Sequence, residues 1–262
     1  MDFDSVLGGM VAVDGGWTAE VPEDWQQGRT AFGGLSAALA LSACRRLVPD
    51  LPVLRSGQIA FIGPAAGELT MRPTLLRRGK SMTFMACDLF SGGVVAMRAL
   101  YAFGGARPSE LSAVAEGPPD CKAPDDCTQM WGGEGVKRPG FARHLDQRPA
   151  GGLVPFSGAD KGDLLVWVRH RDPVAPGIEA LVALGDALPP ASFTRMTGLA
   201  MISTVTWGFD LFDPQPEDGS GWVLMRSTDD GVGDGYAGQD MHMWNDRGRP
   251  ILKARQSVAI FG

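Results

Sequence analysis

Asp186 is the residue whose setting most strongly suggests chemistry. It lies near the end of residues 178–187, an otherwise apolar segment that we predict to be a helix. A carboxylate in apolar surroundings is costly unless it is paired or exposed, and the C-terminal end of a helix disfavours negative charge. Such a group could act as a general base. The alternative is a solvated side chain in the last turn before Pro189 and Pro190.

Two further polar residues lie within strand-like patterns. Gln256 interrupts the apolar alternation of residues 251–261, and Thr204 lies in an alternating segment. A hydroxyl and an amide can each accept and donate hydrogen bonds. Each also has an ordinary interpretation, because threonine is a common strand residue and Gln256 could face solvent at a sheet edge. Ser203 and Thr206 are close neighbours, and a slip in register would put one of them in the place of Thr204.

Gly33 and Gly34 begin a segment, residues 32–48, that we predict to be a helix. The first N–H groups of a helix have no partner within it. At this position they could face a substrate oxygen and stabilise an oxyanion. A plain helix-entry turn explains the same two glycines equally well.

Other catalytic classes have little support. Ser36 lacks the second glycine and the preceding strand of a nucleophile elbow, and residues 231–235 lack a full dinucleotide fingerprint. The histidines, His144, His170 and His242, are dispersed, and no cysteine cluster accompanies them. We therefore expect no covalent nucleophile, no metal and no cofactor.

The elements that must position these residues fall into two similar halves. The Ala- and Leu-rich composition of residues 32–48 predicts a buried helix that ends at Pro49. Strand-length runs separated by Gly-rich turns follow it, at residues 58–62, 69–76, 82–90 and 94–103. In the second half, a strand at 164–171 precedes the helix at 178–187, and strands follow at 203–212, 222–227, 236–244 and 251–261.

The two halves are separated by a stretch rich in Pro, Gly and charged residues. The pattern predicts a first domain at residues 1–105, a linker or surface segment at 106–160, and a second domain at 161–262. Each domain is expected to hold one helix followed by an antiparallel meander, an α+β arrangement that occurs twice.

Composition limits the classes of function. The chain has 262 residues, 44% of them hydrophobic, with 30 acidic and 24 basic residues and a net charge of −6. No basic stripe supports nucleic-acid binding. No apolar stretch approaches the ~20 residues needed to cross a bilayer, and the N-terminus lacks a signal-peptide pattern. The default expectation is a cytoplasmic protein that binds no nucleic acid and no membrane.

The order of these motifs resembles the acyl-CoA thioesterase II family of the thioesterase-like superfamily. In the first half, Phe32-Gly33-Gly34 precedes the Ala/Leu helix, and Arg77-Arg-Gly-Lys-Ser81 follows the first strand. The matching motifs of the second half are Leu184-Gly-Asp186, Ser203-Thr-Val-Thr-Trp-Gly-Phe209, the turn 244–248 and Arg255-Gln-Ser-Val258. The resemblance covers most of the chain outside the linker.

The resemblance implies a double hotdog, in which two antiparallel sheets join and each wraps round a long helix. It also implies hydrolysis of acyl-CoA in lipid metabolism, by a water that an Asp, a Thr or Ser, and a Gln hold together. The matching positions are Asp186, Thr204 and Gln256. The implied partner is a small-molecule acyl-CoA, and a homo-oligomer is left open.

A hotdog protein that binds acyl-CoA or another apolar ligand without hydrolysing it is the alternative. The chain departs from the family pattern at Trp207-Gly208, beside Thr204, and in its linker. A hotdog dehydratase is less well supported, because it should place a His near the active helix and neither predicted helix contains one.

Overall fold

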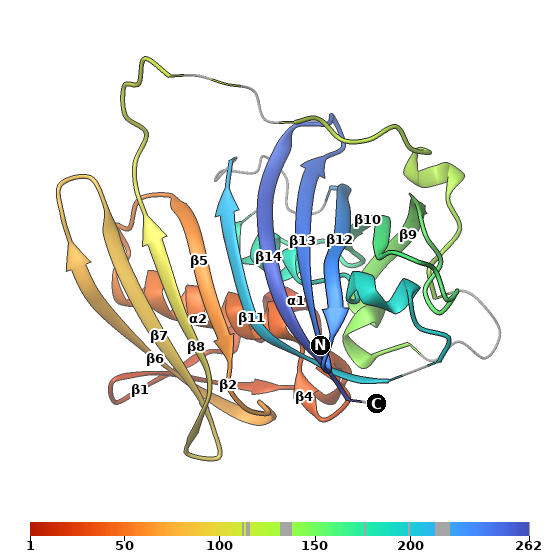
Figure 1. Ribbon diagram of the computed structural model, residues 1–262. Helices are drawn as coiled ribbons and strands as arrows, with labels where there is room; N and C mark the ends of the chain where they lie inside the picture. The colour runs from red at the N-terminus through yellow and green to blue at the C-terminus, as the bar shows by residue number, and fades with distance from the viewer. Residues whose placement is uncertain are drawn as a thin grey trace.

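The computed structural model describes residues 1–111, 113, 116–131, 138–175, 177–198, 200–212 and 221–261. Parts of the predicted linker and Gly262, the end of the predicted second domain, therefore lie outside the described residues. The chain forms a twelve-stranded antiparallel sheet with the strand order β1-β2-β6-β7-β8-β5-β11-β14-β13-β12-β10-β9. The helices α2 and α3 pack against one face of this sheet, which we call the inner face (Figure 1).

The first half begins with small elements and continues as one long helix and a meander. The small elements are α1 (Phe3–Gly8), β1 (Val11–Val13), β2 (Gly16–Val21), η1 (Glu23–Trp25), β3 (Gln26–Gln27) and β4 (Thr30–Ala31). The helix and meander are α2 (Gly33–Leu47), β5 (Leu54–Phe61), β6 (Gly67–Arg78), β7 (Thr83–Ser91) and β8 (Val94–Phe103). The helix and the four strands agree with the sequence pattern.

The second half repeats the helix-then-meander order with a shorter helix. Its elements are η3 (Gly140–His144), β9 (Leu145–Gly152), β10 (Asp163–His170), α3 (Ile178–Gly185), η4 (Ala191–Thr194), β11 (Met201–Leu211), β12 (Val223–Gly233), β13 (Tyr236–Asn245) and β14 (Pro250–Phe261). A further short turn of helix, η2 (Pro124–Asp126), lies between the halves. The eight residues of α3 make it a short helix, where a long one was expected.

Small side chains allow α2 to be buried on every side. Every residue from Gly34 to Cys44 is buried, and most of them are Gly, Ala, Ser or Leu. Small residues let the sheet and the second helix approach the backbone closely, and Ala and Leu favour the helix itself. The helix is also tied to the sheet by Tyr101, whose hydroxyl donates to the Ala37 carbonyl oxygen at 2.7 Å.

The two halves join through β5 and β11 into one continuous sheet. These strands pair antiparallel, with Trp207 opposite Ile59. The helices run antiparallel to each other, since Arg45 near the C-terminal end of α2 forms a salt bridge of 2.8 Å with Glu179 in the first turn of α3. This arrangement brings the N-terminal end of α2 to the C-terminal end of α3.

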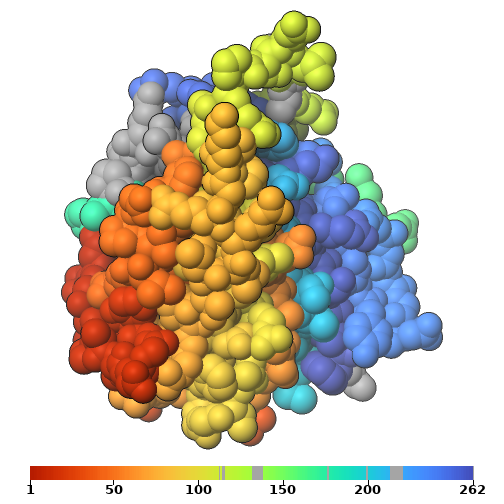
Figure 2. Space-filling model, turned by 90° about the vertical axis from the view of Figure 1, so that its left-hand side faces the viewer, coloured from red at the N-terminus to blue at the C-terminus, as the bar shows by residue number. Residues whose placement is uncertain are grey.

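The predicted linker, residues 106–160, contributes to the second half. It contains β9, which pairs with β10 and forms an edge of the sheet. Part of it, which we call the covering segment (residues 116–130), packs on the outer face of the sheet. There the indole N–H of Trp244 donates to the Glu116 carbonyl, and that of Trp167 donates to the Lys122 carbonyl. Residues 104–111, which follow β8, project beyond the strands of the first half (Figure 2).

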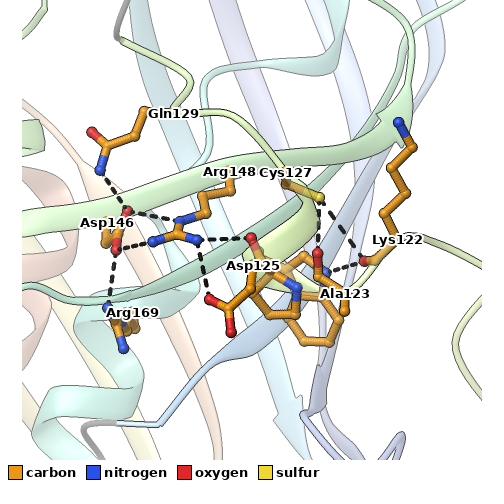
Figure 3. Close-up of polar contacts among 10 residues, drawn as sticks. Lys122, Ala123, Asp125, Cys127, Gln129, Asp146, Arg148 and Arg169 are labelled. Carbon is orange, nitrogen blue, oxygen red and sulfur yellow. Dashed lines mark hydrogen bonds and ion pairs between the residues drawn. The ribbon is translucent and has the colours of Figure 1, made fainter.

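Charged residues fasten the covering segment to β9 and β10 (Figure 3). Arg148 donates to the Pro124 carbonyl at 2.8 Å, and Gln129 donates to the Asp146 carboxylate at 3.2 Å. Asp146 is buried and also pairs with Arg148 and Arg169. The buried carboxylate therefore has two cationic partners and one amide partner, which offset the cost of its burial.

In the described part of the chain, no helix is both long enough and apolar enough to span a membrane.

Candidate active site

Asp186 lies where the two helices meet. It follows the last residue of α3 as its C-cap, and its backbone N–H donates to the carbonyls of the last helical turn. The side chain is partly buried. The sequence expectation of a carboxylate at the end of an apolar helix therefore agrees with its position, and the solvated alternative does not, because the side chain turns toward the sheet and bonds to Gln256.

Gln256 lies on the inner face of β14. Its amide nitrogen, Nε2, donates to Asp186 Oδ1 at 2.5 Å. The side chain is only 3% exposed, which excludes the alternative of an outward-facing residue at an edge. Residues 186 and 256 are therefore brought together from a helix end and a central strand.

Gly33 and Gly34 complete this arrangement at the N-terminal end of α2. A Cβ atom at Gly33 would lie 2.5 Å from Asp186 Oδ2 and 3.0 Å from the Phe61 ring. A Cβ atom at Gly34 would lie 2.4 Å from the Ala183 carbonyl oxygen. Gly34 is required because a side chain there would meet the backbone of α3, whereas at Gly33 a methyl group would displace the Asp186 and Phe61 side chains.

The environment of Asp186 raises its pKa to about 7. Burial is the main cause, because it penalises the charged form. Hydrogen bonds from Gln256 and from the backbone of Gly34 oppose this shift, since they stabilise the carboxylate. The balance gives a carboxyl group that exchanges its proton near neutral pH.

Thr204 lies on the same face of the sheet but is not part of the hydrogen-bonded group. It pairs with Val258 across β11 and β14, one inward-facing position beyond Gln256 on β14. A bulge at Val205 separates Thr204 from Trp207, which pairs with Gln256. Among the described residues, no hydrogen bond joins the Thr204 hydroxyl to Asp186 or Gln256.

Gln239 is a member of the site that the sequence analysis missed. It lies on β13 directly opposite Gln256, is 1% exposed, and donates from Nε2 to Gln256 Oε1 at 2.7 Å. Its own Oε1 accepts a hydrogen bond of 2.8 Å from the Ala191 backbone N–H. A period of two places Gln239 on the same face as Ala237 and Met241, and this alternation could have revealed its burial.

Trp207 forms one wall of the site. Its indole is 1% exposed, and a Cβ atom at Gly185, the residue before Asp186, would lie 2.9 Å from it. The indole N–H is buried and has no hydrogen-bond partner among the residues that the structure describes. In the described residues, no group of three or more His, Cys, Asp or Glu side chains is placed to hold a metal ion.

This geometry suits the activation of a water. A carboxyl group that is partly ionised at neutral pH can accept a proton, and a buried amide donor holds that carboxylate in place. The N-terminal end of a buried helix, whose first N–H groups have no partner within the helix and which carries partial positive charge, lies beside it. An oxyanion that forms near Gly33 would therefore be stabilised.

Two models of known protein families match the chain. The model of the acyl-CoA thioesterase N-terminal domain matches residues 21–104. The model of the acyl-CoA thioesterase C-terminal domain matches residues 118–260. Among curated proteins, a sequence search found no match.

Solved structures share the fold over nearly the whole chain. A hotdog-fold protein of unknown function from Alicyclobacillus acidocaldarius is 20% identical, with a TM-score of 0.89, and covers 99% of this chain and 98% of its own. A putative thioesterase II from Thermobifida fusca YX is 21% identical, with a TM-score of 0.84 and coverage of 99% and 97%. An acyl-CoA thioesterase II from Mycobacterium marinum is 17% identical, with a TM-score of 0.78 and coverage of 98% and 97%. At these identities the likeness shows a hotdog fold.

Proposed function

The chain belongs to the acyl-CoA thioesterase family, and from this premise we propose that it hydrolyses acyl-CoA thioesters to a free acid and CoA. The family match confirms the resemblance noted in the sequence. The observation that carries the proposal is the hydrogen bond between Gln256 and Asp186 beside Gly33, the first residue of α2.

In the proposed mechanism, Asp186 is the general base. It removes a proton from a water while the water oxygen bonds to the thioester carbonyl carbon. The carbonyl π electrons move to oxygen, and the resulting oxyanion lies at the N-terminal end of α2. The Gly34 backbone already bonds to Asp186, so the Gly33 N–H is the donor we assign to the oxyanion.

The second half of the reaction returns the proton. The carbonyl re-forms as the carbon–sulfur bond breaks, and the electron pair leaves with the CoA sulfur. Protonated Asp186 gives its proton to this thiolate and becomes a base again. A thiolate is a good leaving group, so the positioned water needs no covalent intermediate.

Gln256 and Thr204 are proposed to hold the water. The Gln256 amide carries a second hydrogen that is not used by Asp186, and we assign it to the water oxygen. Thr204 faces the same side of the sheet one position away. Its hydroxyl, which has no partner among Asp186 and Gln256, would then bond to the water.

The finer description of the fold belongs to the same proposal. We assign two hotdog repeats, one built on α2 and one on α3. The first keeps its predicted boundaries, residues 1–105, and the second adds β9, from the predicted linker at 106–160, to residues 161–262. We also propose a cytoplasmic enzyme that acts in lipid metabolism. Its substrate is a small-molecule acyl-CoA.

A series of acyl-CoAs from short to long chain tests the activity directly. Purified protein is incubated with each one, and release of free thiol is followed by a colorimetric reagent. We expect turnover of at least one chain length well above the rate without protein. Tight binding of acyl-CoA with no thiol release at any chain length would instead establish a non-hydrolytic binder.

A further inference from the structure

The buried amide groups of Gln239 and Gln256 form a chain whose direction is fixed at one end. The Ala191 backbone N–H can only donate, so the atom of Gln239 that accepts its hydrogen bond at 2.8 Å must be Oε1. Nε2 of Gln239 therefore faces Gln256, where it donates to Oε1 at 2.7 Å. The remaining end of the Gln256 amide, Nε2, is left to donate to Asp186.

We propose that Gln239 is a positioning residue that fixes which way round the Gln256 amide lies, so that Gln256 always presents N–H and never its carbonyl oxygen to Asp186. The inference rests on the proposed hydrolase function, in which Asp186 must be a carboxylate. Gln239 does not itself contact Asp186, and it acts only through Gln256.

The chemistry of a reversed amide shows why this direction matters. If the Gln256 amide rotated by half a turn, its carbonyl oxygen would face Asp186 Oδ1. Two acceptor oxygens repel each other unless the carboxyl group carries a proton, so the reversed amide favours protonated Asp186. A protonated carboxyl group cannot serve as a base.

The two glutamine amides also connect the two ends of one loop. Asp186 and Ala191 are the two ends of the short loop between α3 and η4. Gln239 holds Ala191 directly and holds Asp186 through Gln256. Because Gln239 and Gln256 are 1% and 3% exposed, water cannot easily replace a lost partner.

Gln239→Leu tests the proposal, with Gln147→Leu as a matched control. Gln147 is 2% exposed and donates to the Ala187 carbonyl at 2.9 Å, so it anchors the same loop without touching Gln256. In Gln239→Leu we expect kcat to fall about 10- to 100-fold with little change in KM, as for the loss of a hydrogen bond to a charged group. We also expect the acid limb of kcat/KM to move up by about one pH unit.

The control separates orientation of the amide from anchoring of the loop. Gln147→Leu should lower the melting temperature about as much as Gln239→Leu does. It should leave the acid limb of kcat/KM unchanged. An equal shift of the acid limb in both variants, or no shift in Gln239→Leu, would overturn the proposal. In either case Gln239 would be a structural residue only.

Gln239→Glu gives a second test that preserves shape. While protonated, the introduced carboxyl group can accept from Ala191 and donate to Gln256. Once ionised, it can only accept, so it favours the reversed Gln256 amide. We expect a new alkaline limb in kcat, where the wild type has a plateau. A plateau in the variant up to pH 9 would contradict the proposal.

A titration that needs no turnover distinguishes this inference from the proposed function. The carboxyl carbon of Asp186 is followed by NMR in protein with ¹³C-labelled aspartate, and Asp186→Asn identifies its signal. The midpoint should lie near the wild-type pKa of about 7 and about one unit higher in Gln239→Leu. An unchanged midpoint refutes the role of Gln239. The expected shift, together with no thiol release by the wild type, would refute the hydrolase function alone.

Discussion

The two halves of the sheet hold apolar helices that end differently. The first half surrounds α2, whose buried residues from Gly34 to Cys44 include no charged side chain. The second half holds α3, which ends at a partly buried carboxyl group, Asp186. The strands differ in the same way, since buried Gln239 and Gln256 lie on β13 and β14.

The two halves therefore contribute different kinds of chemical group to the candidate site. In the first half, a buried polar group stabilises the fold: the Tyr101 hydroxyl donates to the Ala37 carbonyl of α2. What it offers to the site is backbone, at Gly33 and Gly34. The second half offers side chains. A repeated architecture can therefore build one asymmetric site, because each unit needs to supply only part of it.

Asp186→Asn should have the largest effect on the second half, because it removes the carboxyl group that lies where the N-terminal end of α2 meets the C-terminal end of α3. The amide keeps the shape of the side chain but cannot accept the proton of the water. General bases contribute typically ~10²–10⁴-fold, so kcat should fall by that order while KM changes little. The measurement is steady-state hydrolysis of the best acyl-CoA. Full activity in the variant would remove Asp186 from the mechanism.

The pH dependence of the wild-type activity also tests whether Asp186 is the general base. The pKa of Asp186 is raised to about 7 by burial, and only the ionised form is a base. The value of kcat/KM should therefore rise about tenfold per pH unit below pH 7 and level off above it. At pH 5 it should be roughly 1% of the plateau. A profile that is flat from pH 5 to pH 8 would show that another group, or none, accepts the proton.

The helices and most strands could be predicted from the sequence, because the composition and hydrophobic periodicity of each segment determine its secondary structure. The Ala/Leu run of residues 32–48 became α2, Gly33–Leu47, with little error at either end. Strand β9 was missed since Leu145–Gly152 contains Pro149 and three residues of Gly or Ala, and has no clear alternation. Proline is tolerated in a strand at the edge of a sheet, which is where β9 lies.

The candidate site was harder to predict because it depends on register. Asp186 was found from its apolar surroundings, which are local. The pairing of Gln239 with Gln256 depends on how β13 and β14 align, and the sequence gives no direct measure of that alignment. Likewise, the bulge at Val205 decides that Thr204 faces inward. A single inserted residue of this kind reverses the direction of every side chain beyond it.

Gly33→Ala and Gly177→Ala compare the two helix starts. A methyl group at Gly33 would lie 2.5 Å from Asp186 Oδ2, whereas one at Gly177, the N-cap of α3, would lie 3.4 Å from its nearest described neighbour, the Glu179 carboxylate. We expect Gly33→Ala to lower kcat about 10- to 100-fold, because small displacements of reacting groups are costly. Gly177→Ala should retain wild-type kcat in the same assay. Equal effects would mean that the two helix ends are not functionally different.

Thr204→Val is the smallest change, and Thr206→Val is its control. Valine keeps the branched shape and removes one hydroxyl, which makes a neutral hydrogen bond worth about 0.5–1.5 kcal/mol. We therefore expect kcat to fall roughly 2- to 12-fold, with Asp186 and Gln256 still holding the water. Thr206 pairs with the exposed Ser257, so its side chain faces away from the helices. Thr206→Val should keep full activity, and a loss there with none in Thr204→Val would place the hydroxyl of the site on the other side of the bulge.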